Sequence, residues 1–189
     1  MTITVVGTGH IGSTLAGIWR RAGIPVTMAS RSPQSDVDGI PVLRLDEALS
    51  SAELVVTAIP GSAMGDFLAD HATTLAEVPL IDASNNVGAT VLHHAVQAGS
   101  IPYYRAFNTL GVENFREPRF DGTPADLFYS GPPSHQQSVE ALIEAVGLRP
   151  VWVGDGPDAA DVLDGLTRLW FTLALQQGRG RHLAFRMLP

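Results

Sequence analysis

Near the start of the chain stands the stretch Ile3-Thr4-Val5-Val6-Gly7-Thr8-Gly9-His10-Ile11-Gly12. Its first four residues are apolar or β-branched, which predicts a short buried strand. The glycines follow the spacing G-x-G-x-x-G, and apolar residues then recur at helical intervals, at Leu15, Ile18 and Trp19. The glycine spacing is a weak signal alone. Between a strand and an amphipathic helix, it predicts the turn that binds a dinucleotide.

Each glycine of this turn has a physical role in that interpretation. Gly7 permits the tight turn, Gly9 lets a pyrophosphate approach the backbone, and Gly12 lets the helix pack closely on the strand. Free N–H groups and the positive end of the helix dipole would then hold the anion. The alternative is an ordinary glycine-rich turn. The expected cofactor contacts are Gly7, Thr8, Gly9, His10, Ile11 and Gly12.

The rest of the chain alternates short runs rich in Val and Ile with segments of helical periodicity. This alternation is typical of a parallel sheet covered by helices on both faces. We therefore predict an α/β fold of the Rossmann type, with a doubly wound parallel sheet. The expected strands lie near Ile3–Val6, Pro25–Ala29, Leu54–Ala58, Pro79–Asp82 and Tyr103–Phe107, with later ones near Leu127–Tyr129 and Pro150–Val153.

The segments between these strands differ in character. Residues Asp36–Leu45 are expected to form a loop, Asp46–Ser51 a short helix and Ser62–Leu75 a longer one. Residues Glu113–Pro124 hold two prolines and mixed charges, which predicts an irregular connection. From Asp158 to Leu175, apolar residues surround most of a helix. That helix should be buried, and we expect it to be buried chiefly against a second subunit.

The composition excludes several classes of protein. The 189 residues suffice for one domain, or one domain with a small appendage, and the absence of cysteine excludes disulfides and thiolate metal sites. A formal net charge of −7 argues against a nucleic-acid binder. The first residues form no basic leader, and no run approaches the roughly 18 apolar residues of a membrane span. We expect a cytoplasmic protein without nucleic-acid or membrane partners.

The end of the second strand indicates which nicotinamide dinucleotide is bound. An acidic residue there would accept the ribose 2′-hydroxyl and would repel a 2′-phosphate. The chain instead has Ser30 and Arg31, and no acid occurs before Asp36. A hydroxyl and a planar guanidinium suit a phosphate dianion, so we expect NADP(H) as the cofactor. In the alternative interpretation, Arg31 stacks on the adenine without selecting the phosphate.

Polar or small residues follow three further strands. Because ligands of open α/β sheets lie beyond the carboxyl ends of the strands, these residues are candidates for the same rim. The alternative is that they cap helices or form turns. The cofactor candidates are Ala58, Ile59, Pro60, Ser84 and Asn85, and the substrate candidates are Asn108 and Thr109.

Other reaction types have less support. His93 and His94 are adjacent, and neighbouring helical residues diverge by about 100°, so we expect no metal site. The chain has no G-x-S-x-G elbow and no lysine after the glycine turn, where Ser13 and Thr14 follow instead. Hydrolase and ATPase interpretations therefore lose their main support.

The sequence resembles the NADPH-dependent reductases of the deazaflavin coenzyme F420, a group that is similar to the reductase domain of membrane metalloreductases. The resemblance covers nearly the whole chain. Its first two motifs are cofactor motifs, and the others are more particular to the group. They are Gly7-Thr8-Gly9-His10-Ile11-Gly12, Ala29-Ser30-Arg31, Ala106-Phe107-Asn108-Thr109, Leu166-Thr167-Arg168-Leu169-Trp170 and the ending Phe185-Arg186.

The resemblance implies a Rossmann domain over residues 1–155 and a C-terminal helical segment over 156–189 that completes the cleft and contributes to a homodimer interface. It further implies direct hydride transfer between NADPH and a stacked deazaflavin or flavin, with no catalytic acid or base. Thr167 would then join Asn108 and Thr109 at the substrate. Where members of the group can place a basic residue, this chain has Asp158, Asp161 and Asp164, which predicts an acidic rim.

Two other functions remain compatible with these residues. One is an NADPH-dependent ferric or quinone-type reductase that uses a freely bound flavin. The other is a binding protein that senses NADP(H) without catalysis. In either enzyme the redox partner is a small molecule.

Overall fold

The computed structural model describes residues 1–32 and 36–188. Each predicted strand is present within one or two residues of its expected bounds. The strands are β1 (Ile3–Val6), β2 (Val26–Ser30), β3 (Asp36–Val37), β4 (Ile40–Arg44), β5 (Leu54–Thr57), β6 (Leu80–Asp82), β7 (Tyr103–Arg105), β8 (Arg119–Phe120), β9 (Thr123–Pro124), β10 (Asp126–Tyr129) and β11 (Arg149–Trp152). The helices are α1 (His10–Arg21), α2 (Leu45–Ser50), α3 (Met64–His71), α4 (Glu113–Arg116), α5 (Gln136–Val146) and α6 (Gly156–Phe171).

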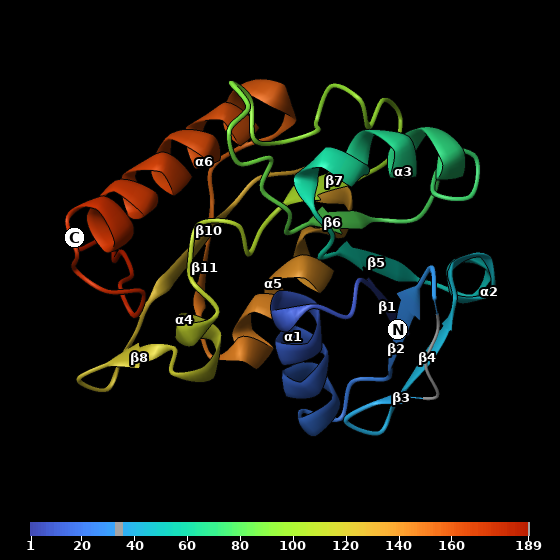
Figure 1. Ribbon diagram of the computed structural model, residues 1–189, viewed down its shortest axis with the longest axis horizontal. Coiled ribbons are helices and arrows are strands. Elements are labelled where there is room, and N and C mark those ends of the chain that lie inside the picture. Colours follow the sequence, from blue (N-terminus) through green and yellow to red (C-terminus); the bar gives the residue numbers. More distant parts are fainter. Residues whose placement is uncertain (33–35, 189) are drawn as a thin grey trace.

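The main sheet has seven strands in the order β3-β4-β2-β1-β5-β6-β7 (Figure 1). Every neighbouring pair is parallel except β3 and β4. The chain runs outward from β1 to β2 and β4 on one side, and to β5, β6 and β7 on the other. This reversal of strand order places a ligand-binding crevice beyond the carboxyl end of β1. The predicted Rossmann-type α/β fold is confirmed.

Alternating side chains of the central strands supply two hydrophobic clusters, one on each face of the sheet. Ile3 and Val5 belong to the cluster that contains Trp19 of α1, while Val6 joins the cluster that contains Phe67 of α3. Trp19 is fully buried, and its Nε1 donates a hydrogen bond to the carbonyl of Leu142 in α5 at 2.9 Å. Helices α1 and α5 therefore cover one face, and α3 covers the other.

Two Asp-Gly pairs form hairpin turns in segments where the sequence interpretation placed loops. Asp38 and Gly39 have φ of 51° and 74°, and Asp121 and Gly122 have φ of 47° and 78°. Positive φ at both central residues matches the twist of a two-residue hairpin. The loop prediction for Asp36–Leu45 is therefore wrong, because that segment forms β3 and β4.

Packing explains why β4 and the segment Glu113–Pro124 differ from the predictions. In β4, Ile40 and Val42 are buried and Pro41 is exposed, which is the alternation of a half-buried strand. The prediction of an irregular connection over Glu113–Pro124 is wrong in part, since α4 and the β8–β9 hairpin lie there. Phe115 of α4 is buried with its ring 5.7 Å from that of Phe107. The helix expected over Ser62–Leu75 is shorter, because α3 ends at His71.

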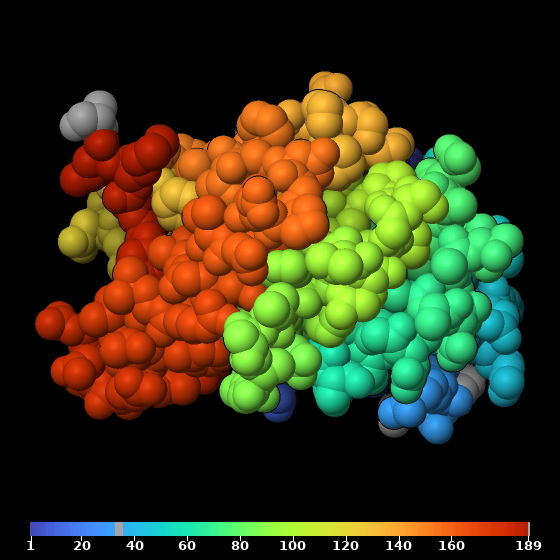
Figure 2. Space-filling view, turned by 90° about the horizontal axis from the view of Figure 1, so that it is seen from above, coloured from blue at the N-terminus to red at the C-terminus, as the bar shows by residue number. Residues whose placement is uncertain are grey.

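Helix α6 has one buried face and one outward apolar face. Asp155 caps its N-terminus by accepting a hydrogen bond from the N–H of Gly156 at 2.7 Å. Leu163 and Trp170 are buried, whereas Val162 is 60% exposed and Leu169 is 46% exposed. Figure 2 shows this helix, in orange, on the surface of the molecule. No helix in the described part of the chain has the length and hydropathy of a membrane span.

Candidate functional site

A pocket of about 480 Å³ lies at the carboxyl ends of β1, β2 and β5. The parallel register of these three strands brings their ends to one edge of the sheet. Eight of the predicted cofactor residues line this pocket together, although they come from three separate segments of the sequence. They are Gly7, Thr8, Gly9, Ser30, Arg31, Ala58, Ile59 and Pro60.

The glycine turn has the shape that a bound pyrophosphate requires. Gly7 has φ of 112°, and a Cβ there would lie 2.5 Å from the carbonyl oxygen of Ala58. A Cβ at Gly12 would collide with the carbonyl oxygen of Gly7. A Cβ at Gly9, in contrast, would meet nothing within 4 Å. Close packing therefore requires glycine at positions 7 and 12. Gly9 leaves open space beside the backbone, so the turn has room for a pyrophosphate group.

Helix α1 starts at His10, so its first N–H groups have no partner inside the helix. Its first turn contains no acidic residue, and therefore no carboxylate competes there for an anion. The hydroxyl of Ser13 donates to the carbonyl of Gly9 at 2.9 Å and closes the turn. His10, Ile11 and Gly12 belong to this helical turn and do not line the pocket themselves.

Two polar side chains stand at the end of β2. Ser30 Oγ accepts a hydrogen bond from the N–H of Ser32 at 3.3 Å, which leaves its own O–H proton free to donate. Arg31 is exposed and, among the described residues, forms no ion pair within 4 Å. A hydroxyl donor and an uncompensated guanidinium thus face the same pocket.

One wall of the pocket comes from α3, which the sequence interpretation missed. Asp66 and Asp70 are one helical turn apart, as are Phe67 and His71, and all four line the pocket. The rings of Phe67 and His71 lie 5.1 Å apart. The two ring planes are tilted by 51° to each other. An aromatic side chain can pack against a base, and a carboxylate can accept a hydrogen bond from an exocyclic amine. The sequence did contain a signal for this wall. Asp66 and Asp70, like Phe67 and His71, are four residues apart in a helical segment shortly after Pro60, and this spacing places each pair on one face of a helix. Leu45 and Ala63 complete the wall.

The remaining predicted site residues form a second, buried polar cluster at the ends of β6 and β7. Asn85 Nδ2 donates to the carbonyl of Asn108 at 3.0 Å, and Asn108 Nδ2 donates to Thr167 Oγ1 at 3.0 Å. Thr167 Oγ1 also donates to the carbonyl of Leu163 in its own helix at 2.9 Å. These contacts join the β7 edge to α6. Asn85, Asn108 and Thr167 therefore meet one another, away from the pocket lined by Arg31.

Three atoms of this cluster have no hydrogen-bond partner among the described residues. They are Ser84 Oγ, Asn108 Oδ1 and Thr109 Oγ1, and their side chains are almost completely buried. Unpartnered buried polar atoms cost free energy and are rare in folded proteins. All three residues follow β6 or β7 at the carboxyl edge of the sheet, and the three atoms are enclosed by protein in this conformation.

A buried arginine connects this cluster to the sheet. Arg105 of β7 is fully buried, with its guanidinium 3.5 Å from Asp82 Oδ2 and 3.6 Å from Asp164 Oδ1. It also donates to Asn85 Oδ1 at 2.7 Å and to the carbonyl of Ser84. Two carboxylates from β6 and α6 thus neutralise one guanidinium, and that guanidinium positions the segment 84–85.

The groups around Asp82 keep its carboxyl group ionised. Burial alone would raise the pKa of Asp82, but the Arg105 guanidinium and hydrogen bonds from His94, Ser84 and Tyr103 outweigh it and lower the pKa below its usual range. The hydroxyl of Tyr103 donates to Asp82 Oδ2 at 2.6 Å. Burial raises the pKa of Tyr103 well above its ordinary value, and the neighbouring Asp82 adds to that effect. Asp82 is therefore a carboxylate and Tyr103 a neutral donor.

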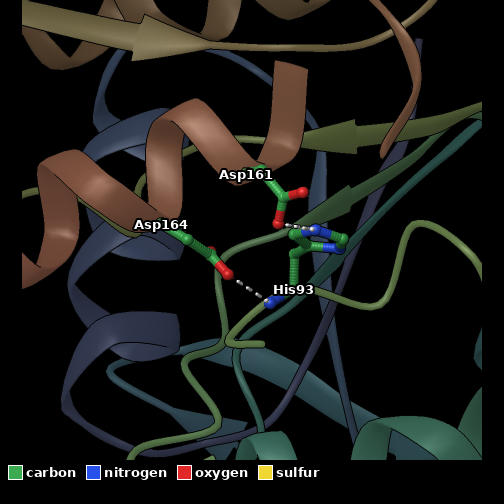
Figure 3. A group of neighbouring side chains, drawn as sticks. All are labelled: His93, Asp161 and Asp164. Atoms are coloured by element: carbon green, nitrogen blue, oxygen red, sulfur yellow. Dashed lines mark hydrogen bonds and ion pairs between the residues drawn. The ribbon is translucent and has the colours of Figure 1, made fainter. Parts of the chain in front are cut away.

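His93, Asp161 and Asp164 approach one another closely enough to suggest a metal site (Figure 3). However, His93 Nδ1 accepts a hydrogen bond from the N–H of Ala95 at 3.1 Å, so the ring proton lies on Nε2 and points to Asp161 Oδ1 at 3.2 Å. Asp164 Oδ2 accepts the N–H groups of Leu92 and His93. The group is thus a hydrogen-bonded clasp between α6 and the segment 92–95.

Two expectations change here. His93 and His94 lie in an irregular segment and not in a helix. Asp164 was expected on an acidic rim, but it is fully buried and faces Arg105. Only Asp158 and Asp161 remain at the surface, and Asp161 is bonded to His93.

Comparison with known proteins agrees with the fold and with the pocket. The family model of the D-isomer specific 2-hydroxyacid dehydrogenase, NAD binding domain, matches residues 1–76. This range runs from β1 past α3 and holds every residue that lines the pocket. No curated protein matches the chain.

Several solved structures share the architecture. A protein named as a candidate F420-dependent NADP-reductase from Arthrobacter sp. FB24 is 22% identical, with a TM-score of 0.83 and complete coverage of both chains. A hypothetical protein from Sinorhizobium meliloti is 25% identical, with a TM-score of 0.70 over 100% of this chain and 96% of the other. The Streptomyces aurantiacus imine reductase is 21% identical, with a TM-score of 0.71, and 94% of this chain covers 64% of it. These likenesses agree with the Rossmann-type fold, and the matched domain supports a nicotinamide dinucleotide site within residues 1–76.

The Asp82–Arg105 pair generates a prediction for stability against pH. Asp82→Asn should destabilise the fold by about 3 kcal/mol at pH 7, because the hydrogen bonds from Ser84 and Tyr103 lose their charged acceptor. Arg105 keeps Asp164 as its ion-pair partner. A lowered folded pKa contributes stability fully above the unfolded value of about 3.9, and this contribution is lost as the pH falls through the folded pKa. The difference from wild type should therefore shrink below about pH 4. Urea unfolding at pH 7, 5, 4 and 3 measures it.

The matched control for this test is Glu144→Gln, which removes an exposed carboxylate from the end of α5. We expect it to change the free energy of unfolding by less than about 0.5 kcal/mol at pH 7. If the difference between Asp82→Asn and wild type stays constant from pH 7 to pH 3, folding does not lower the pKa of Asp82.

Proposed function

We propose that this protein is an NADP(H)-dependent oxidoreductase that transfers a hydride between NADPH and a deazaflavin of the F420 type or a flavin. The observation that carries the proposal is the pocket in which the glycine turn, Ser30 and Arg31 converge. The turn supplies the pyrophosphate cradle. Ser30 and Arg31 supply a hydroxyl and a guanidinium where an NAD-specific pocket would hold an acid.

The polar cluster at the ends of β6 and β7 is the proposed substrate side of the site. Asn108 Nδ2 is bonded to Thr167, and Asn108 Oδ1 has no partner among the described residues, so a small movement of the side chain on ligand binding would make Oδ1 an acceptor for an N–H group. Thr109 Oγ1 offers a further hydroxyl. A nicotinamide bound there supplies or accepts the hydride itself. The protein then has to hold two flat rings in register and exclude water, and we assign no residue as a catalytic acid or base.

Two alternatives use the same pocket with a different outcome. A ferric or quinone-type reductase with free flavin would need the same NADP(H) site and a less specific second site. An NADP(H)-sensing protein would bind the dinucleotide and transfer nothing.

Turnover separates these functions. We expect the protein to oxidise NADPH, followed by the loss of its absorbance, in the presence of a deazaflavin coenzyme or a free flavin. Asn108→Ala should lower the turnover rate more than it weakens NADPH binding, because the side chain lies at the substrate end. Rapid turnover with ferric or quinone acceptors alone would favour the reductase alternative. Tight NADPH binding without turnover on any acceptor would overturn the enzyme proposal.

Cofactor preference is the second test. Arg31→Ala should weaken NADPH binding about 10- to 100-fold and leave NADH nearly unchanged, because a hydrogen bond to a charged group contributes about 1.5–3 kcal/mol. Raised salt should erode the preference of the wild type, since Arg31 is exposed. Calorimetric titration of both dinucleotides against both proteins gives the four affinities. Equal losses for NADPH and NADH would mean that Arg31 stacks on the adenine.

We also propose that the protein forms a homodimer through α6. Val162, Leu166, Leu169 and Leu173 recur at intervals of three or four residues and form one outward apolar stripe on the helix and the turn that follows it. The opposite face of α6 is already buried against its own chain. A helix that is apolar on both faces needs a second cover, and two copies of one stripe related by a twofold axis cover each other.

Sedimentation tests the dimer. The wild type should sediment as a dimer at micromolar concentration, and Val162→Asp combined with Leu169→Asp should give a folded monomer, because buried charges oppose association. The control is Val96→Asp, which adds the same charge at a residue that is 71% exposed and outside the stripe. A monomeric wild type would contradict the proposal, as would a dimer that survives both substitutions.

A further inference from the structure

A second groove, separate from the dinucleotide pocket, runs along the outer face of α1. Its volume is about 570 Å³, and Figure 1 shows α4 on one side of α1 and the β3–β4 hairpin on the other. The face of α1 that packs on the sheet carries Leu15 and Trp19, so the groove lies on the opposite side of the helix. Its lining residues are Ser13, Thr14, Gly17, Arg20, Arg21, Asp38, Ile40 and Arg116.

Three of these residues are arginines, in a chain whose formal net charge is −7. Within the described part of the chain, none of the three lies within 4 Å of a carboxylate oxygen. Arg20 donates to the carbonyl of Asp38 at 2.7 Å, and Arg116 donates to Thr14 Oγ1 at 3.3 Å. Both partners are neutral groups. The groove also holds the carboxylate of Asp38, and Glu113 interacts with Arg116 over a longer distance, so the three arginines are only partly balanced by acidic groups.

Gly17 leaves room for the Arg21 side chain at the floor of the groove. A Cβ there would lie 3.4 Å from Nη1 of Arg21, which shows that the Arg21 side chain folds back along α1 over this glycine. The guanidinium groups of Arg20 and Arg21 come from the last turn of α1, and that of Arg116 comes from α4. Like charges gathered on one groove repel each other in the absence of an anion.

We propose that this groove binds a polyvalent anion that carries phosphate or carboxylate groups. Guanidinium groups bind both kinds of oxyanion through paired N–H donors, and several of them on one groove favour a ligand with more than one charge. Two kinds of ligand carry such anionic groups. One is the polyanionic tail of the redox coenzyme, an assignment that rests on the proposed function. The other is a free phosphate compound that binds independently of catalysis.

The first experiment measures the anion alone. Inorganic tripolyphosphate is titrated by calorimetry into the full chain at low salt, with saturating NADP⁺ present so that the glycine turn is already occupied. We expect one bound tripolyphosphate per chain, and an affinity about tenfold weaker in the variant R21Q/R116Q, as two exposed charge pairs of up to about 1 kcal/mol each would give. Arg20 is left in place because it holds the hairpin carbonyl.

The control for charge is R119Q, which removes an exposed arginine of β8 that bonds to the carbonyl of Gly122 and does not line the groove. It should change the affinity less than about twofold. No binding to the wild type would overturn the proposal, and so would equal binding by the wild type and R21Q/R116Q. The unfolding curve of each variant is measured first, so that a lost fold is not mistaken for a lost site.

A second experiment separates the two sources. The Michaelis constant is compared for a deazaflavin coenzyme with its anionic tail and for a tail-free deazaflavin. A rise in R21Q/R116Q for the tailed coenzyme alone assigns the groove to the tail. Unchanged constants, together with lost tripolyphosphate binding, assign it to a free anion. If neither deazaflavin is reduced, the proposed acceptor fails, and the titration still decides whether the groove binds anions.

Discussion

The arrangement at the carboxyl edge of the sheet depends on the burial of one charge, the guanidinium of Arg105. A buried cation is tolerated only when it is paired and hydrogen-bonded, and here Asp82 and Asp164 approach it from β6 and from α6. Because the two carboxylates lie 82 positions apart in the chain, this one group holds the last helix against the central sheet. The same guanidinium donates a hydrogen bond to Asn85 and so positions this residue of the neighbouring polar cluster.

The site therefore has two halves with different physical origins. The dinucleotide half is built from backbone geometry, because Gly7 and Gly12 are required by close contacts and Gly9 leaves open space. The other half is built from side chains that come together only when α6 packs on β7. The first half lies within residues 1–76, the range matched by an NAD-binding domain, whereas α6 lies outside it.

This difference explains what the sequence could predict. Periodicity located all strands of the parallel sheet except β4, and with the glycine spacing it placed Ser30 and Arg31 beside the glycine turn, because these signals are local. Strand β4 was missed because only Ile40 and Val42 mark it, although the preceding Asp38-Gly39 was a readable turn signal. Arg105 carried no local signal at all. Its role arises from two carboxylates that are distant in sequence, and periodicity carries no information about such contacts.

The clasp formed by His93, Asp161 and Asp164 also limits how the part of the molecule around α6 can change in sequence. Rotating α6 by one residue would move Asp164 away from the backbone N–H groups of Leu92 and His93. The buried guanidinium of Arg105 would then lose one of its two carboxylate partners. These contacts fix the position of α6 along its own axis and its rotation about that axis. Single side chains can be exchanged along a helix that keeps its register, so sequence changes in α6 should be substitutions and not insertions inside the helix.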